Sequence, residues 1–158
     1  DELKSLLKNP ANTKQAILKL QEENSSLKKE VEKLILEKAK SLKNELIDQI
    51  EALNGVNFLA TSIEMDAGTI KNMAFELGDQ VSNLFFINGS KSDGKALLTI
   101  YISKNLTEEK KLNAGTIVRE LGKHIQGGGG GQSFFATAGG KNPQGISKAL
   151  AEARNYII

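Results

Sequence analysis

The stretch that decides the fold is Gly127-Gly128-Gly129-Gly130-Gly131-Gln132-Ser133-Phe134-Phe135-Ala136-Thr137-Ala138-Gly139-Gly140-Lys141. Five consecutive glycines are costly, because each loses more backbone freedom on folding than any other residue and adds no side chain to a core. The run therefore predicts a loop, the glycine loop 127–131, at which something must approach the bare main chain closely.

Two interpretations of the glycine loop fit these residues. Its backbone N–H groups can form a concavity that binds phosphate, with Lys123, His124 and Lys141 beside it. Alternatively, the loop is a turn, or a place where two backbone segments pack closely. A phosphate loop of the nucleoside triphosphatases is excluded because no Gly-Lys-Ser/Thr follows the run. A dinucleotide-binding fingerprint is excluded because its glycines join a strand to the following helix.

Other residues near the glycines could also contact a polyanion. His124 either contacts RNA, by stacking on a base or by donating to phosphate, or caps the end of a helix. Arg119 is a candidate because arginine binds phosphate through two donors, although a solvated position on its helix is the favoured interpretation. We expect Phe134 and Phe135 to be buried; the alternative is that one of them stacks on an exposed base.

The segments before and after the glycines predict a small mixed α/β (α+β) domain. Apolar periodicity predicts a strand, a helix capped by Asp66, two strands joined by a polar hairpin segment, a second helix, a short strand and a last helix. The order β-α-β-β-α-β-α follows, with these elements at 56–63, 66–81, 84–87, 96–102, 107–125, 134–138 and 142–157.

The first third of the chain predicts one long helix. From Ala11 to Leu53 there is no Pro or Gly, and residues that favour helices predominate. Apolar residues recur at heptad spacing with one slip between Leu34 and Ile35, which is typical of a coiled coil. Because Asn54-Gly55 favours a helix stop, we expect a helical dimerisation segment over 1–54 and a globular domain over 55–158.

Composition limits the kind of partner. Hydrophobic residues make up 39% of the chain and charged residues 25%, as in soluble globular proteins. There is no cysteine and one histidine, so a conventional metal site is not expected. Residues 110–158 carry seven basic and two acidic side chains, a charge of +5 that suits a polyanion. Because the chain opens on Asp1 and contains no apolar run of membrane-spanning length, we expect a segment of a cytoplasmic protein.

The glycine stretch, followed by Ala149-Leu150-Ala151 in the last predicted helix, resembles the C-terminal end of bacterial alanyl-tRNA synthetases. The resemblance covers the whole chain and implies a domain that binds the elbow of tRNA(Ala), a homodimer formed through the long helix, and cooperation with other domains of the synthetase. It places the catalytic sites upstream, so no catalytic residue and no cofactor is expected here, whereas the full-length enzyme would use ATP, magnesium and zinc.

The same domain is similar to the accessory domain of DHH-family phosphoesterases, which usually carry a His directly after the glycines. Gln132 stands at that position here, which favours binding over phosphoester chemistry. The two alternatives to a tRNA-binding role are a structural homodimerisation module and a phosphoesterase accessory domain. The expected RNA-contacting residues are the five glycines together with Arg119, Lys123, His124, Gln132 and Lys141.

Overall fold

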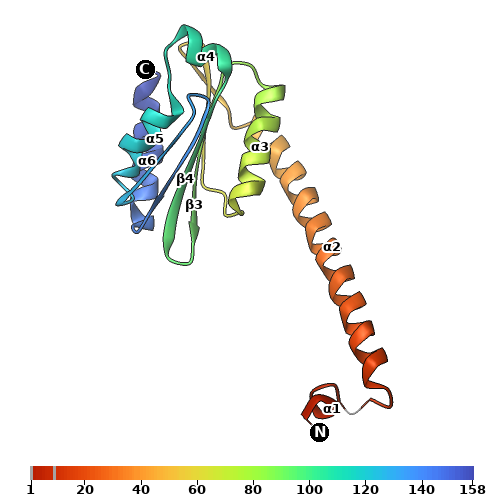
Figure 1. Ribbon diagram of the computed structural model, residues 1–158. Coiled ribbons are helices and arrows are strands. Elements are labelled where there is room, and N and C mark those ends of the chain that lie inside the picture. Colours follow the sequence, from red (N-terminus) through yellow and green to blue (C-terminus); the bar gives the residue numbers. More distant parts are fainter. Residues whose placement is uncertain (1, 9) are drawn as a thin grey trace. The chain divides into compact units, whose positions relative to one another are not determined.

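The computed structural model describes residues 2–8 and 10–158. The chain forms two compact units, of which the first ends at Ser41 and the second runs from Leu42 to Ile158. Helix α1 (Glu2–Leu6) and most of helix α2 (Thr13–Ile47) lie in the first unit (Figure 1). None of the helices in the described part of the chain is long and apolar enough to cross a membrane.

Helix α2 contains 35 residues, a length of about 50 Å. Its sequence lacks the residues that stop helices, as predicted. The large apolar side chains between residues 17 and 36 are all exposed, by 38% to 69%: Ile17, Leu18, Leu20, Leu27, Val31, Leu34, Ile35 and Leu36. The end of α2 differs from this part, because Leu46 is buried and Lys43 Nζ lies 2.9 Å from Glu76 Oε2 of helix α3 (Ala67–Gln80).

The prediction that the long helix reaches Leu53 is wrong. The helix ends at Ile47, and strand β1 (Glu51–Leu53) pairs antiparallel with β2 (Val56–Thr61). Asn54 and Gly55, at φ 51° and 77°, form the two-residue turn between these strands. Positive φ at both central positions matches the twist of a hairpin, so Asn-Gly acts here as a hairpin turn and not as a helix stop.

The sheet has six strands in the order β1-β2-β3-β4-β6-β5. Only β2 and β3 run parallel, and α3 connects them; all other neighbours are antiparallel. The predicted mixed α/β order is confirmed, with two edge strands added. The remaining elements are β3 (Leu84–Ser92), β4 (Lys95–Ile102), α4 (Lys104–Glu109), α5 (Ala114–Gly122), β5 (Gly127–Gly131), β6 (Phe135–Gly140), α6 (Ile146–Ala153) and two 3-10 turns, η1 (Pro143–Gly145) and η2 (Arg154–Tyr156).

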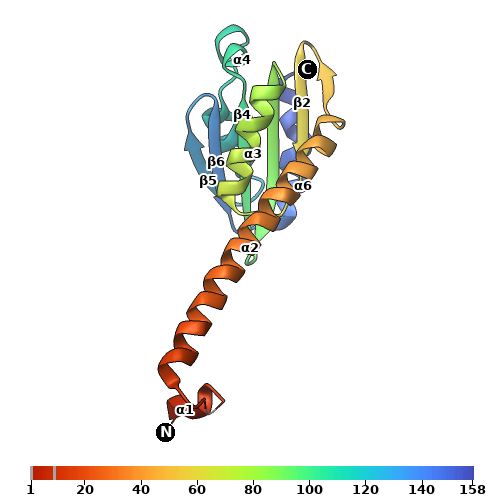
Figure 2. The same cartoon turned by 90° about the vertical axis from the view of Figure 1, so that its right-hand side faces the viewer.

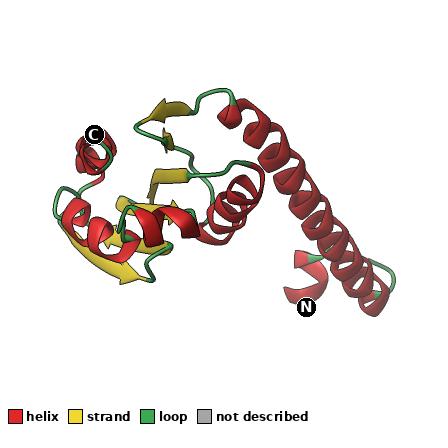
Figure 3. Ribbon diagram, turned by 90° about the horizontal axis from the view of Figure 1, so that it is seen from above, coloured by secondary structure: helices red, strands yellow, loops and turns green. Residues whose placement is uncertain are grey.

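Helices cover both faces of the sheet and create two apolar cores. Helix α3, with its predicted cap at Asp66, packs on one face through Ile70, Met73, Ala74 and Leu77, all fully buried. Helices α4, α5 and α6 pack on the other face. Figure 1 shows α3 on one side of the strands and α5 and α6 on the other, and Figures 2 and 3 show the same layers from the side and from above.

The helix predicted over 107–125 is in fact two helices. Helix α4 ends at Glu109, and Lys111 has a φ of 56°, a conformation that cannot continue a right-handed helix. Asn113 then caps α5, because its side chain accepts a hydrogen bond from the backbone N–H of Thr116 at 3.0 Å.

The glycine run is a strand, so the prediction of a loop is wrong. Strand β5 pairs with β6 from Gly127↔Gly140 to Gly131↔Ala136. A Cβ added at Gly127, Gly129 or Gly131 would collide with the backbone of β6. Helix α5 also comes close, since a Cβ at Gly115 would lie 2.8 Å from the carbonyl oxygen of Gly131. Alternate glycines are therefore needed for close packing of backbone segments, the second interpretation given above.

Substitution of two neighbouring glycines in β5 should affect the stability of the domain to different extents. We expect Gly129→Ala to lower the free energy of unfolding by about 2 kcal/mol, because its methyl group would overlap β6. Gly128→Ala should change it by less than about 1 kcal/mol, because no atom lies within 4 Å of the added Cβ. Chemical denaturation of the two variants measures the difference, and equal stabilities would contradict this packing account.

Candidate nucleic-acid interface

A cleft of about 990 Å³ lies where the β3–β4 hairpin meets the beginning of β5 and the end of β6. The residues leading into α3 line it as well. We call it the glycine cleft, because Gly127, Gly139 and Gly140 form part of its wall. All of its lining residues belong to the unit 42–158.

The charged side chains of the glycine cleft are three lysines, Lys91, Lys95 and Lys141, and three acids, Glu64, Asp66 and Asp93. All three lysines are exposed. The ion pairs formed within residues 2–8 and 10–158 leave these lysines unpaired. They are therefore available to an anion that enters the cleft.

Two glycines leave the backbone uncovered beside these lysines. Gly128 and Gly139 are partners across β5 and β6, and nothing lies within 4 Å of a Cβ added at either residue. Cross-strand partners share a face of the sheet, so together they form one patch without side chains. Because β5 is an edge strand, every second N–H and C=O of its backbone lies outside the ladder. A phosphate or ribose can approach such a surface more closely than one covered by side chains.

The structure brings only some of the predicted site residues to this cleft. Gly127 and Lys141 line it, whereas Arg119 lies beside Gly130, with its guanidinium 3.4 Å from where a Cβ there would be. Gln132 is in the turn between β5 and β6, where its N–H donates to the carbonyl of Phe135 at 2.8 Å. Gln132 is five positions along the chain from Gly127, about 17 Å in an extended strand.

Lys123 and His124 form contacts within the domain. Lys123 forms an ion pair with Glu120 on α5, and the hydrogen bond between the two side chains raises the pKa of Lys123. His124 Nε2 lies 2.6 Å from Glu152 Oε2 on α6, and only 19% of its side chain is exposed. The carbonyl of His124 also accepts from the side chain of Asn142 at 3.2 Å. His124 thus ties α6 to the turn after α5, a role that neither sequence interpretation gave it.

A family model described as the DHHA1 domain matches residues 55–158. The chain belongs to the DHHA1 domain family. Its relatives include an alanine–tRNA ligase of Christiangramia forsetii, 54% identical over 157 residues, which cover 99% of this chain and 18% of the ligase. An alanine–tRNA ligase of Bacteroides thetaiotaomicron is 46% identical over 150 residues, covering 94% of the chain and 17% of that ligase.

A solved structure of an alanyl-tRNA synthetase domain has a similar fold. The C-Ala domain of Aquifex aeolicus alanyl-tRNA synthetase superposes with a TM-score of 0.62 at 25% identity, covering 68% of this chain and 96% of that domain. The chain spans less than a fifth of the length of the ligases it matches. The similarity therefore concerns one segment of a larger enzyme.

In this DHHA1 domain the hairpin lysines Lys91 and Lys95 are candidates that sequence reasoning missed. They lie more than 30 residues before the glycines, next to the Asp93-Gly94 turn of the hairpin. Pairing of β4 with β6, in which Leu97 is opposite Gly139, brings them to the cleft. No local sequence pattern shows which residues of β4 and β6 pair. Only the alternation of side chains along both strands could have suggested that these lysines lie at the cleft.

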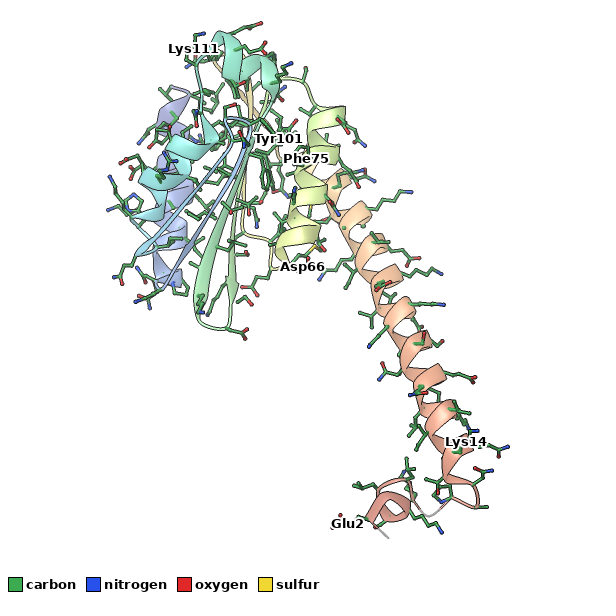
Figure 4. The ribbon with its side chains drawn as sticks, viewed as in Figure 1. Glu2, Lys14, Asp66, Phe75, Tyr101 and Lys111 are labelled. Carbon is green, nitrogen blue, oxygen red and sulfur yellow. The ribbon has the colours of Figure 1, made fainter. Side chains whose placement is uncertain are left out.

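Asp66 is the acid of the cleft with a clear structural role (Figure 4). Its side chain accepts from the hydroxyl of Thr69 and, at 2.9 Å, from the backbone N–H of Thr69 in the first turn of α3. These bonds, with the hydroxyl as the larger cause, lower the pKa of Asp66 below its ordinary value of 3.8. The charge of Asp66 is thus partly engaged by its own helix.

The cap predicts a pH-dependent contribution to stability. We expect Asp66→Ala to destabilise the DHHA1 domain by about 1 kcal/mol at neutral pH. Because the folded pKa is lowered, the contribution is fully present above pH 3.8 and is lost as the pH falls through the folded pKa. Urea unfolding of the unaltered protein and of Asp66→Ala from pH 7 to pH 3 should show that their difference in unfolding free energy narrows only at the acidic end. A difference that stays constant over this pH range would contradict a stabilising role for the ionised Asp66 carboxylate.

Proposed function

We propose that residues 55–158 bind tRNA(Ala) as a domain of an alanine–tRNA ligase, with the ligation reaction performed outside this chain. The observation that carries the proposal is the uncovered Gly128–Gly139 pair beside three unpaired lysines. It is supported by the relatives, which are alanine–tRNA ligases, and by the likeness to a synthetase C-Ala domain.

The proposed mode of binding is recognition of shape. Backbone groups and lysines contact phosphate and ribose, which carry no direct sequence information. The choice of the tRNA elbow as the contacted region follows from the resemblance to alanyl-tRNA synthetases. Among the residues that the structure describes, no group of three or more His, Cys, Asp or Glu side chains could hold a metal ion. From the resemblance to alanyl-tRNA synthetases, we propose that ATP, magnesium and zinc are used by other domains of a cytoplasmic enzyme.

Binding of tRNA(Ala) should depend on salt. Titration of labelled tRNA(Ala) with the 158-residue chain should show an affinity that falls steeply between about 50 and 200 mM salt, because counterions are released from the neutralised phosphates. Lys141→Ala should weaken binding and reduce the slope of log affinity against log salt by about one.

The matched control is Lys148→Ala, which removes an exposed lysine from α6, the helix that packs on the opposite face of the sheet. This variant should retain both affinity and slope. Absence of binding at low salt, or an affinity that salt does not change, would refute the proposed function.

A second proposed function, self-association, is favoured by the apolar stripe of α2. Eight large apolar side chains between residues 17 and 36 are exposed, more than a solvated helix normally carries. They include the heptad positions Leu20, Leu27, Val31 and Leu34, which would form the seam with a second copy of the chain.

Breaking the seam should separate the two functions. We expect light scattering to give a dimer for the whole chain and a monomer for Leu27→Glu, because a charge at the seam would be buried without a partner. Lys29→Glu, a charge change two residues away, should remain a dimer. The domain 55–158 should still bind tRNA in the monomer; a monomeric unaltered chain would contradict self-association through α2.

A further inference from the structure

A second pocket, of about 600 Å³, lies at the other end of β4 and β6 from the glycine cleft. It is bounded by α3, the end of β4, α4 and the turn before β6. Three aromatic side chains, Phe75, Tyr101 and Phe134, line it together with Lys104 and Lys111. We call it the aromatic pocket.

The rings of the aromatic pocket are held in place. The ring centroid of Phe75 lies 5.1 Å from that of Tyr101 and 6.3 Å from that of Phe134, with edge-on geometry in both pairs. Figure 4 shows Phe75 and Tyr101 side by side. The hydroxyl end of Tyr101 occupies the space that a Cβ at Gly78 would need. The pocket is thus largely preformed, which lowers the entropic cost of binding.

Phe134 offers an apolar surface at this pocket. Its side chain is 40% exposed, and Phe135 is half-buried, so the prediction that both rings are buried is wrong. The reason is that Phe134 precedes β6, while Phe135 opens that strand and packs on Phe75 at 5.5 Å. Among residues 42–158, all of which the structure describes, no other aromatic side chain is exposed. A flat apolar ring presented in this way suits stacking.

Lysine side chains lie beside the rings, although Glu108 also lines the pocket and Asp79 lies near Tyr101. Lys104 and Lys111 are exposed; Glu108 lies 3.8 Å from Lys104, but both side chains are well solvated and such pairs are weak. Lys71 Nζ lies 5.5 Å above the ring of Phe135, next to the pocket. Aromatic rings bordered by cations are the combination that binds single-stranded nucleic acid.

The aromatic pocket and the open glycines share one face of the sheet. Tyr101 is paired with Phe135, and Leu97 with Gly139, so alternate residues of β4 and β6 face α3. Phe135 and Gly139 are four residues apart, about 14 Å along the strand. One RNA segment can therefore reach both places.

We infer that the aromatic pocket receives an unstacked nucleobase of the bound tRNA, which stacks on Phe134 while the adjoining phosphate lies near Lys104 and Lys111. The inference rests on the proposed tRNA binding and adds a base contact to the backbone contacts of the glycine cleft. A peptide is the competing occupant. An apolar peptide gains nothing from the lysines, and the acidic side chains of a peptide carry no flat ring to place on Phe134, whereas one nucleotide combines a ring with a phosphate.

Phe134→Ala should weaken binding of tRNA(Ala) by roughly five-fold to 150-fold, the range found when an aromatic platform for one base is removed. The salt slope should stay unchanged, because no charge is lost. Lys111→Ala should instead lower both affinity and slope. Ile158→Ala, which truncates another exposed apolar side chain, is the matched control and should bind normally.

Phe134→Trp keeps a stacking surface and adds a reporter, since the chain has no other tryptophan. It should bind as the unaltered chain does, and tRNA should quench its fluorescence. If the unaltered chain binds tRNA while Phe134→Ala binds equally well, or if the tryptophan signal does not respond, the aromatic pocket has another occupant and the inference is overturned. If the unaltered chain does not bind tRNA, the proposed function fails and the inference fails with it.

Discussion

The close pairing of β5 with β6 is the contact on which the rest of the domain depends. Gly127, Gly129 and Gly131 approach β6 so closely that a single methyl group at any of them would overlap its backbone. Helix α5 also comes close to these two strands, at Gly115 and Gly122, though less closely than the strands approach each other. Burial of Val118 and Leu121 on the same helix then gives the apolar stabilisation that offsets the conformational cost of so many glycines.

This pairing confirms the close packing of backbone segments at the glycine run and shows which part of its main chain stays uncovered. The main chain of β5 is bare along its length, but alternate positions differ in what surrounds them. The odd-numbered glycines face neighbouring backbone and serve packing, whereas Gly128 has open space and shares it with Gly139. A feature required for packing therefore leaves, as its by-product, a strip of accessible backbone on the α3 face.

Local signals in the sequence predicted the elements whose stability is local. The cap at Asp66, the buried stripe of α3 and the strand from 96 to 102 follow from periodicity and capping chemistry. The strand predicted over 84–87 is longer, because β3 continues to Ser92 through polar residues that were predicted to form the hairpin connection. The errors concern residues whose conformation depends on distant partners. Asn54-Gly55 suits a helix stop and a hairpin equally well, and glycine has so little strand preference that β5 exists only because β6 and α5 enclose it. The hairpin lysines were missed for the same reason, since register alone brings them to the glycines.

The charges of the glycine cleft argue for recognition by shape. Three lysines and three acids line the cleft, so their formal charges sum to zero and any attraction for phosphate depends on where each charge lies. Because Asp66 is held by Thr69, its carboxylate stays at the start of α3, where it repels phosphate from that side. A phosphate could approach the backbone closely at Gly128 and Gly139, because nothing lies within 4 Å of a Cβ added at either residue. In the proposed mode of binding, lysines supply attraction, acids keep phosphate away from the start of α3, and the glycines determine how near the ligand comes.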